Sequence, residues 1–103
     1  MSEAKQLSED EKALVWINEK VNNELSAAMQ RYPSMSSPHE GYAIILEELD
    51  ELWDEVKPKP ANRSIDRMRA EAIQVAAMAM RFAVDITYTP EGAVAASNER
   101  LVH

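Results

Sequence analysis

The chain has 103 residues, a formal net charge of −7 and no cysteine. This length favours one small domain with a modest core, and the missing cysteine excludes disulfides and thiolate zinc sites. The negative charge argues against binding nucleic acid through its phosphates, which needs a basic surface. No apolar run approaches membrane-spanning length. Because the polar N-terminus is no signal peptide, we expect a cytoplasmic protein.

The first predicted helix covers residues 9–31, after a flexible N-terminus at 1–8. Ser8 and Glu11 have the spacing of a capping box, in which the serine side chain accepts from the first turn and the glutamate reaches back. Apolar residues recur behind the box at helical spacing, at Leu14, Ile17, Val21, Leu25 and Met29.

The second predicted helix covers residues 38–56. Ser37 and Glu40 repeat the capping-box spacing, and Pro38 takes the first helical position, where a missing N–H does no harm. The KPKP stretch at 57–60 ends the helix, because two prolines cannot continue it. The apolar stripe of this helix consists of Ile45, Leu49, Leu52 and Val56.

The third predicted helix covers residues 64–86 and is rich in alanine. Its interior face is predicted from spacing as Ile65, Met68, Ala72, Val75, Ala76, Ala79, Phe82, Ala83 and Ile86. In the C-terminal segment 88–103, Thr89 would cap a short further helix. Since no strand pattern competes, we expect one all-α domain over 1–103. The third helix has more apolar surface than two neighbours can cover, so a homodimer or homotetramer should complete the core.

Six carboxylates crowd into the nine positions 47–55 of the second helix. Such repulsion lowers stability, so either the face is solvated or a cation binds there. Glu48 and Glu51 are three residues apart, and Glu47 and Glu51 are four apart, so all three lie on adjacent turns. An antiparallel third helix would bring Glu71 opposite them. Hard cations bind to such oxygen ligands, and helical bundles build metal sites in this way.

The residues alone also permit a simpler interpretation. A charged run on one helix is usually a solvated face, and Asp54 and Glu55 near the helix end fit that pattern. Ordinary pairs at a spacing of four residues are also available, namely Arg67 with Glu71 and Arg81 with Asp85.

The two motifs Glu47-Glu48-Leu49-Asp50-Glu51 and Glu71-Ala72-Ile73-Gln74 have a recognisable order. They resemble the signature of the MazG-like all-α nucleoside triphosphate pyrophosphohydrolases, in which two Glu, two variable residues and a Glu are followed, after a spacer, by Glu, two variable residues and Asp. The resemblance extends from about Gln30 to Ile86, and the short forms of phages and mobile elements are the most similar.

This resemblance implies an antiparallel MazG-type bundle that hydrolyses a (d)NTP to a (d)NMP and pyrophosphate with Mg²⁺, or with Mn²⁺ in its place. Glu48, Glu51 and Glu71 would be metal ligands, and Glu47 would orient the attacking water or accept its proton. These four form the predicted catalytic set. Gln74 stands where the family has Asp, so its amide oxygen would be an uncharged fourth ligand, unless the side chain is simply a hydrogen-bonded core amide.

Substrate binding requires cations for the phosphates and an apolar or aromatic surface for the base. The predicted set is Arg67 and Arg81 for the phosphates and Trp53 and Tyr42 for the base, with Trp16 and Tyr32 as further aromatic candidates.

Two other functions stay open on the sequence. One is a related enzyme, such as a phosphoribosyl-ATP pyrophosphohydrolase or a dimeric dUTPase, because the motif handles the phosphates and not the base. The other is a non-catalytic helical interaction protein that has lost its last metal ligand at Gln74.

Overall fold

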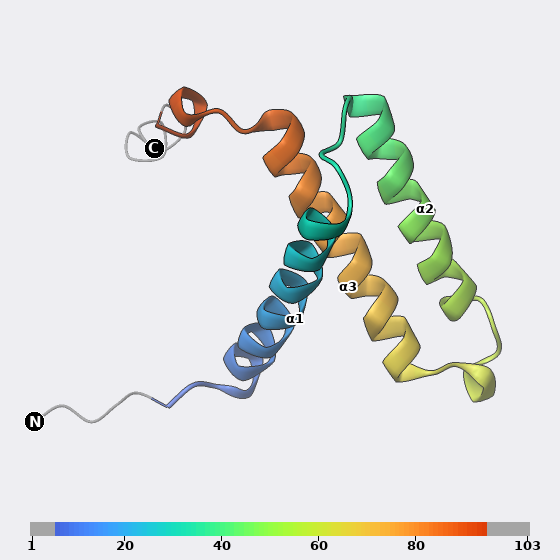
Figure 1. The fold of residues 1–103 in the computed structure, drawn as a ribbon. Coiled ribbons are helices and arrows are strands. Elements are labelled where there is room, and N and C mark those ends of the chain that lie inside the picture. The colour runs from blue at the N-terminus through green and yellow to red at the C-terminus, as the bar shows by residue number, and fades with distance from the viewer. Residues whose placement is uncertain (1–5, 95–103) are drawn as a thin grey trace, which may run out of the picture.

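The computed structural model describes residues 6–94, which contain helices and short connections but no strand. The elements are α1 (Glu9–Arg31), α2 (Pro38–Val56), the 3₁₀ turn η1 (Pro60–Asn62), α3 (Ile65–Phe82) and the π-helical turn η2 (Ala83–Thr87) (Figure 1). A further helical stretch begins at Pro90. The predicted all-α class is confirmed. The predictions for residues 1–5 and 95–103 lie outside the described residues.

Serine side chains fix where the first two helices begin. The capping box at Ser8 is complete, since its hydroxyl accepts from the Glu11 N–H at 3.1 Å and the Glu11 carboxylate accepts from the Ser8 N–H at 3.1 Å. Of the two hydrogen bonds in the capping box predicted at Ser37, only one forms. Its hydroxyl accepts from the Glu40 N–H, but the Glu40 carboxylate accepts from the N–H and hydroxyl of Ser36.

Helix α3 is the central element. α2 packs antiparallel beside it through the turn at η1, and α1 crosses α3 on another side, so α1 and α2 diverge (Figure 1). The core lies where both helices meet α3 and consists of Val21, Leu25, Met35, Ile73, Ala77 and Met78. None of the helices within residues 6–94 has the length and hydropathy needed to cross a bilayer.

The predicted interior face of α3 is partly wrong. Ile65 and Ala72 are exposed, whereas Ile73 and Ala77 are buried. The prediction from helical spacing places all interior residues on one stripe, which is correct only if α3 packs against a single neighbour. In the structure two helices contact α3 on different sides, so its buried surface is broader and rotated toward α1.

Arg81 and Asp85 tie the end of α3 to the connection between α1 and α2. Arg81 is only 5% exposed. Asp85 Oδ2 accepts from Arg81 Nε at 3.0 Å and from the Met35 N–H at 2.9 Å. The remaining guanidinium nitrogens donate to the carbonyl oxygens of Ala28, Tyr32 and Pro33. The sequence suggested a surface pair here, and the structure corrects this to a buried pair held by the π-helical turn η2.

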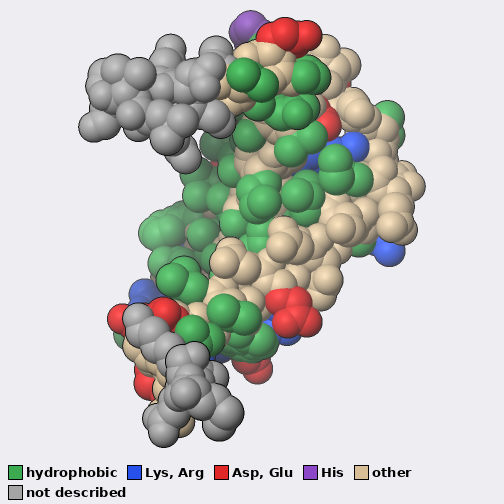
Figure 2. Space-filling view, turned by 90° about the vertical axis from the view of Figure 1, so that its left-hand side faces the viewer, with side chains coloured by type: hydrophobic (Ala, Val, Ile, Leu, Met, Phe, Trp, Pro, Cys, Tyr) green, Lys and Arg blue, Asp and Glu red, His purple; other side chains and the backbone are tan. Residues whose placement is uncertain are grey.

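Much apolar surface remains uncovered in a single chain. Tyr42, Leu46, Leu49 and Trp53 recur every three or four residues along α2, and all four are exposed. Figure 2 shows a different face of the molecule, on which hydrophobic side chains also gather. Contiguous apolar patches of this kind are uncommon on monomers and mark interaction surfaces.

Candidate metal centre

Three carboxylates meet between α2 and α3. Glu48 and Glu51 lie one turn apart on α2, and Glu71 comes from α3. One carboxylate oxygen from each residue lies within 4.8 Å of the other two. The antiparallel hairpin therefore brings together the three side chains that the sequence predicted as metal ligands, and we call them the carboxylate cluster.

The carboxylate cluster lacks compensating charge. Glu71 Oε2 is buried and has no hydrogen-bond partner among the described residues. Burial, together with the neighbouring Glu51 and then Glu55, raises the pKa of Glu71. Burial is also the first cause that raises the pKa of Glu48 to about 7, with Glu51, Glu71 and Glu47 adding to it. A proton is therefore held here more tightly than on an ordinary glutamate, and a cation would take its place.

The arginine that could have paired with Glu71 is engaged elsewhere. Arg67 Nε donates to Glu55 Oε2 at 2.9 Å, and the Glu55 side chain is 25% exposed. The alternative pairing of Arg67 with Glu71 is thus not formed. The interpretation of Glu55 as a purely solvated residue is wrong, because this pair bridges α2 and α3.

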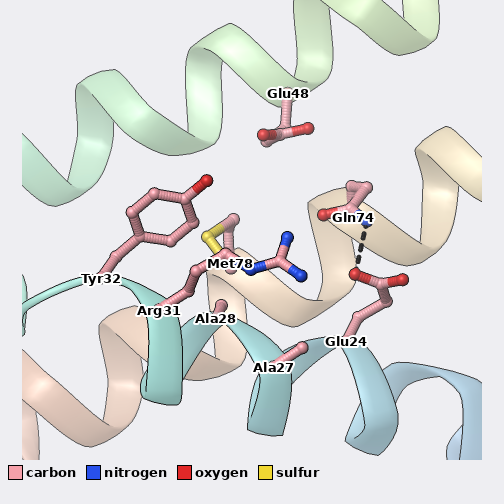
Figure 3. A pocket seen from close by; sticks show the side chains of 8 residues that line it. All are labelled: Glu24, Ala27, Ala28, Arg31, Tyr32, Glu48, Gln74 and Met78. Carbon is pink, nitrogen blue, oxygen red and sulfur yellow. Dashed lines mark hydrogen bonds between the residues drawn. The ribbon is translucent and has the colours of Figure 1, made fainter.

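Gln74 lies beside the carboxylate cluster and bonds to α1. Its Nε2 donates to Glu24 Oε2 at 2.7 Å (Figure 3). Since an ionised carboxylate only accepts, the amide oxygen must point the other way, toward a cavity of about 210 Å³ that Glu48 also lines. Glu24 adds a fourth acidic side chain near the centre. Glu24 was not among the predicted site residues, because it lies on α1, outside both motifs.

Glu47 is exposed and lies next to the carboxylate cluster, not in it. With Glu48 it lines a second cavity of about 370 Å³. The apolar walls of this cavity include Tyr32, Met35, Ile44 and Met78. Of the aromatic candidates, Tyr32 is therefore the one beside the carboxylate cluster.

The other aromatic candidates lie elsewhere. Tyr42 and Trp53 are exposed, and each lies more than about 100° around α2 from Glu48 by its position in the sequence. Tyr42 instead borders a separate surface pocket at the start of α2. Trp16 lies beneath cationic side chains of α1 and α3. The substrate roles predicted for Tyr42 and Trp53 therefore find no support in a single chain.

The predicted phosphate-binding arginines are also occupied. Arg67 is paired with Glu55. Arg81 borders the second cavity, but its guanidinium is buried and donates to a carboxylate and three carbonyl oxygens of the fold. A structural role for Arg81 replaces the expected substrate role, because binding a phosphate would require breaking these bonds.

Comparisons with known proteins identify no relative. No protein-family model, no curated protein and no solved structure matches this chain. Inference about its activity therefore depends on the motifs and on the geometry of the carboxylate cluster.

Proposed function

We propose that this protein is a MazG-like, Mg²⁺-dependent nucleoside triphosphate pyrophosphohydrolase that converts a (d)NTP to a (d)NMP and pyrophosphate. The observation that carries the proposal is the buried, unpartnered Oε2 of Glu71 in a cluster with Glu48 and Glu51. A carboxylate oxygen that is buried without a hydrogen-bond partner lowers the stability of the fold. A cation that binds all three side chains offsets this penalty, and no described arginine or lysine forms an ion pair with any of them.

The residues fit a hard divalent cation. Mg²⁺ and Mn²⁺ prefer oxygen ligands, and charged carboxylates bind them best. Glu48, Glu51 and Glu71 would hold the ion, with the amide oxygen of Gln74 on the same side. When bound, the ion supplies positive charge for the phosphates and makes a nearby water more acidic.

The side chains around the carboxylate cluster suit two further steps, which are accepting the proton of the attacking water and binding the nucleoside. In the reaction a water oxygen bonds to the α-phosphorus, and the bond from that phosphorus to the α,β-bridging oxygen breaks, so pyrophosphate leaves with the electron pair. Glu47, at the rim of the second cavity, would accept the proton that the water loses. The apolar walls of that cavity would contact the nucleoside, and its volume of about 370 Å³ falls within the usual range for small-molecule sites.

A second copy of the chain would complete the bundle, as a homodimer or as a homotetramer built from two dimers. The exposed stripe Tyr42, Leu46, Leu49 and Trp53 on α2 is the surface that such a partner would cover. Light scattering at micromolar concentration should give at least twice the chain mass, and Leu49→Glu should lower it. A monomeric mass for the wild type would contradict this assembly.

Enzymatic activity is tested by pyrophosphate release from a panel of ribo- and deoxyribonucleoside triphosphates with Mg²⁺. Wild type should release pyrophosphate, Glu51→Gln should abolish release, and Asp50→Asn, one residue away and exposed, should not. The preferred substrate separates this activity from that of a phosphoribosyl-ATP pyrophosphohydrolase or a dUTPase. No release from any substrate by a folded, metal-binding protein would favour the non-catalytic interaction protein.

A further inference from the structure

The cavity of about 210 Å³ beside the carboxylate cluster has a cationic wall. It lies between the last turns of α1 and the pair α2–α3, and Glu48 reaches it from α2 (Figure 3). Opposite Glu48, Arg31 extends its guanidinium into the cavity, and the hydroxyl of Tyr32 points into it as well. The cavity thus places a positive group and a hydroxyl across from a carboxylate of the cluster.

Arg31 differs from the other arginines that the structure describes. Arg63, Arg67, Arg69 and Arg81 each donate to a carboxylate or a carbonyl oxygen of the protein. Within residues 6–94, the side chain of Arg31 forms no hydrogen bond and no ion pair, although Glu24 and Glu48 line the same cavity. Arg31 lies in the last turn of α1, where the helix dipole favours a positively charged side chain. The dipole does not explain why this side chain points into the cavity.

The volume and the donor groups limit what the cavity can hold. A volume of about 210 Å³ is below the range of about 300–1,000 Å³ for sites that enclose a whole small molecule. A guanidinium binds two oxygens of one phosphate in a planar fork. In a chain with net charge −7, an anion would enter with a divalent cation bound at the carboxylate cluster.

We propose that this cavity is the subsite for the phosphate chain of the substrate, in which Arg31 and the hydroxyl of Tyr32 bind phosphate oxygens across from the cation held by Glu48. The inference rests on the proposed pyrophosphohydrolase function and gives Arg31 the role that the sequence had suggested for Arg67 and Arg81. The nucleoside then lies in the second cavity, which shares Tyr32 and Glu48 with this one.

The test is calorimetric titration of inorganic pyrophosphate into the full chain with saturating Mg²⁺. Arg31→Gln should weaken binding about 10- to 100-fold, which corresponds to the loss of hydrogen bonds to a charged group. Arg31→Lys should retain part of the affinity, because it keeps the charge and loses the fork. Arg69→Gln is the matched control, since it makes the same change of charge at an arginine paired with Asp66.

A separate titration with Mg²⁺ alone distinguishes this inference from the function on which it rests. Arg31→Gln should bind Mg²⁺ as wild type does, because it is no metal ligand. If wild type does not bind Mg²⁺, both proposals fail. If Mg²⁺ binds but pyrophosphate does not, or if Arg31→Gln and Arg69→Gln bind pyrophosphate equally well, the Arg31 subsite alone is overturned. Thermal melts of each variant show that it is folded.

Discussion

Two groups of charged side chains lie along α3, and they differ in how well they are compensated. Near its C-terminal end, the buried Arg81–Asp85 pair joins two opposite charges at 3.0 Å. Three carbonyl oxygens and one backbone N–H complete the bonding of that pair. Near its middle, Glu71 faces two further carboxylates, and one of its oxygens is buried without a partner among residues 6–94.

This difference separates residues that stabilise the fold from residues that, in our proposal, bind a cation. Buried polar groups in folded proteins almost always have partners, so the satisfied pair needs no explanation beyond stability. An uncompensated cluster lowers stability, and groups of this kind concentrate at functional sites. The comparison therefore predicts opposite effects when charge is removed from the two places.

The largest effect is expected at the satisfied pair. Arg81→Met should lower the free energy of unfolding by about 3–5 kcal/mol, because it leaves Asp85 buried and unpaired. Urea denaturation followed by circular dichroism measures the change. Lys12→Met, at an exposed pair with Glu9, should change it by less than about 1 kcal/mol. Equal losses in the two variants would show that the burial of Arg81 does not add to the free energy of unfolding.

Gln74→Asp should cost up to about 2 kcal/mol of metal-free stability, because it replaces the donor to Glu24 with a like charge. The same variant should bind Mg²⁺ more tightly, since a carboxylate is a better ligand than an amide. Thermal melts with and without Mg²⁺ measure both. The double variant Glu24→Gln, Gln74→Glu exchanges donor and acceptor and should recover metal-free stability. Should Gln74→Asp gain no extra response to Mg²⁺, Gln74 is not a metal ligand.

Glu71→Gln should have a smaller and opposite effect on the metal-free protein. It should stabilise it by up to about 1 kcal/mol, because it removes the repulsion between the partly buried Glu71 and its acidic neighbours. The same change should abolish the rise in melting temperature with Mg²⁺, a rise expected because a ligand of the folded state stabilises it. Glu51→Gln should also weaken the response to Mg²⁺. Asp50→Asn is the control for removing one negative charge from α2 outside the carboxylate cluster. A substitution of Glu55 would be a poor control, because Glu55 pairs with Arg67. Unchanged Mg²⁺ responses in the glutamate variants would indicate an ordinary acidic surface.

Without metal, the stability of the protein should also depend on pH. The pKa of Glu48 rises from 4.5 to about 7 in the folded protein. Between these values the folded state binds more protons than the unfolded state, so stability should fall as pH rises from about 5 to 8. Denaturation in EDTA at several pH values measures this slope. Glu48→Gln should flatten it and Asp50→Asn should not, and a slope that survives in Glu48→Gln would assign it to another group.

Features set by neighbouring residues were predictable from the sequence. The bounds of α1 and α2 follow from serine caps and prolines within a few residues of each end. The carboxylate cluster needed only the i, i+3 spacing of Glu48 and Glu51 and an antiparallel hairpin. The pair of Arg67 with Glu71, suggested by their spacing of four residues, was wrong. Arg67 bonds instead to Glu55 on α2, a partner that the spacing along α3 does not reveal.

Features set by how α1 crosses α3 were not predictable. The burial of Val21 and Leu25 fixes that crossing, and no pattern in the sequence encodes its angle. The crossing brings Glu24 to Gln74 and directs Arg31 toward Glu48. Glu24 lies 50 residues from Gln74, and Arg31 and Glu48 lie on different helices, so no local pattern in the sequence predicts either pairing.

The separation of α2 and α3 depends on Gly41. This residue is buried, and a Cβ built on it would lie 2.5 Å from Phe82 Cδ2 and 3.0 Å from Met35 Sδ. Glu48 follows seven residues later, about 10 Å along the same rigid helix. A methyl group at Gly41 would force Phe82, Met35 or α2 to shift, and a shift of α2 would change the distance between Glu48 and Glu71. The geometry of the proposed metal centre therefore depends on a residue that is not one of its proposed ligands.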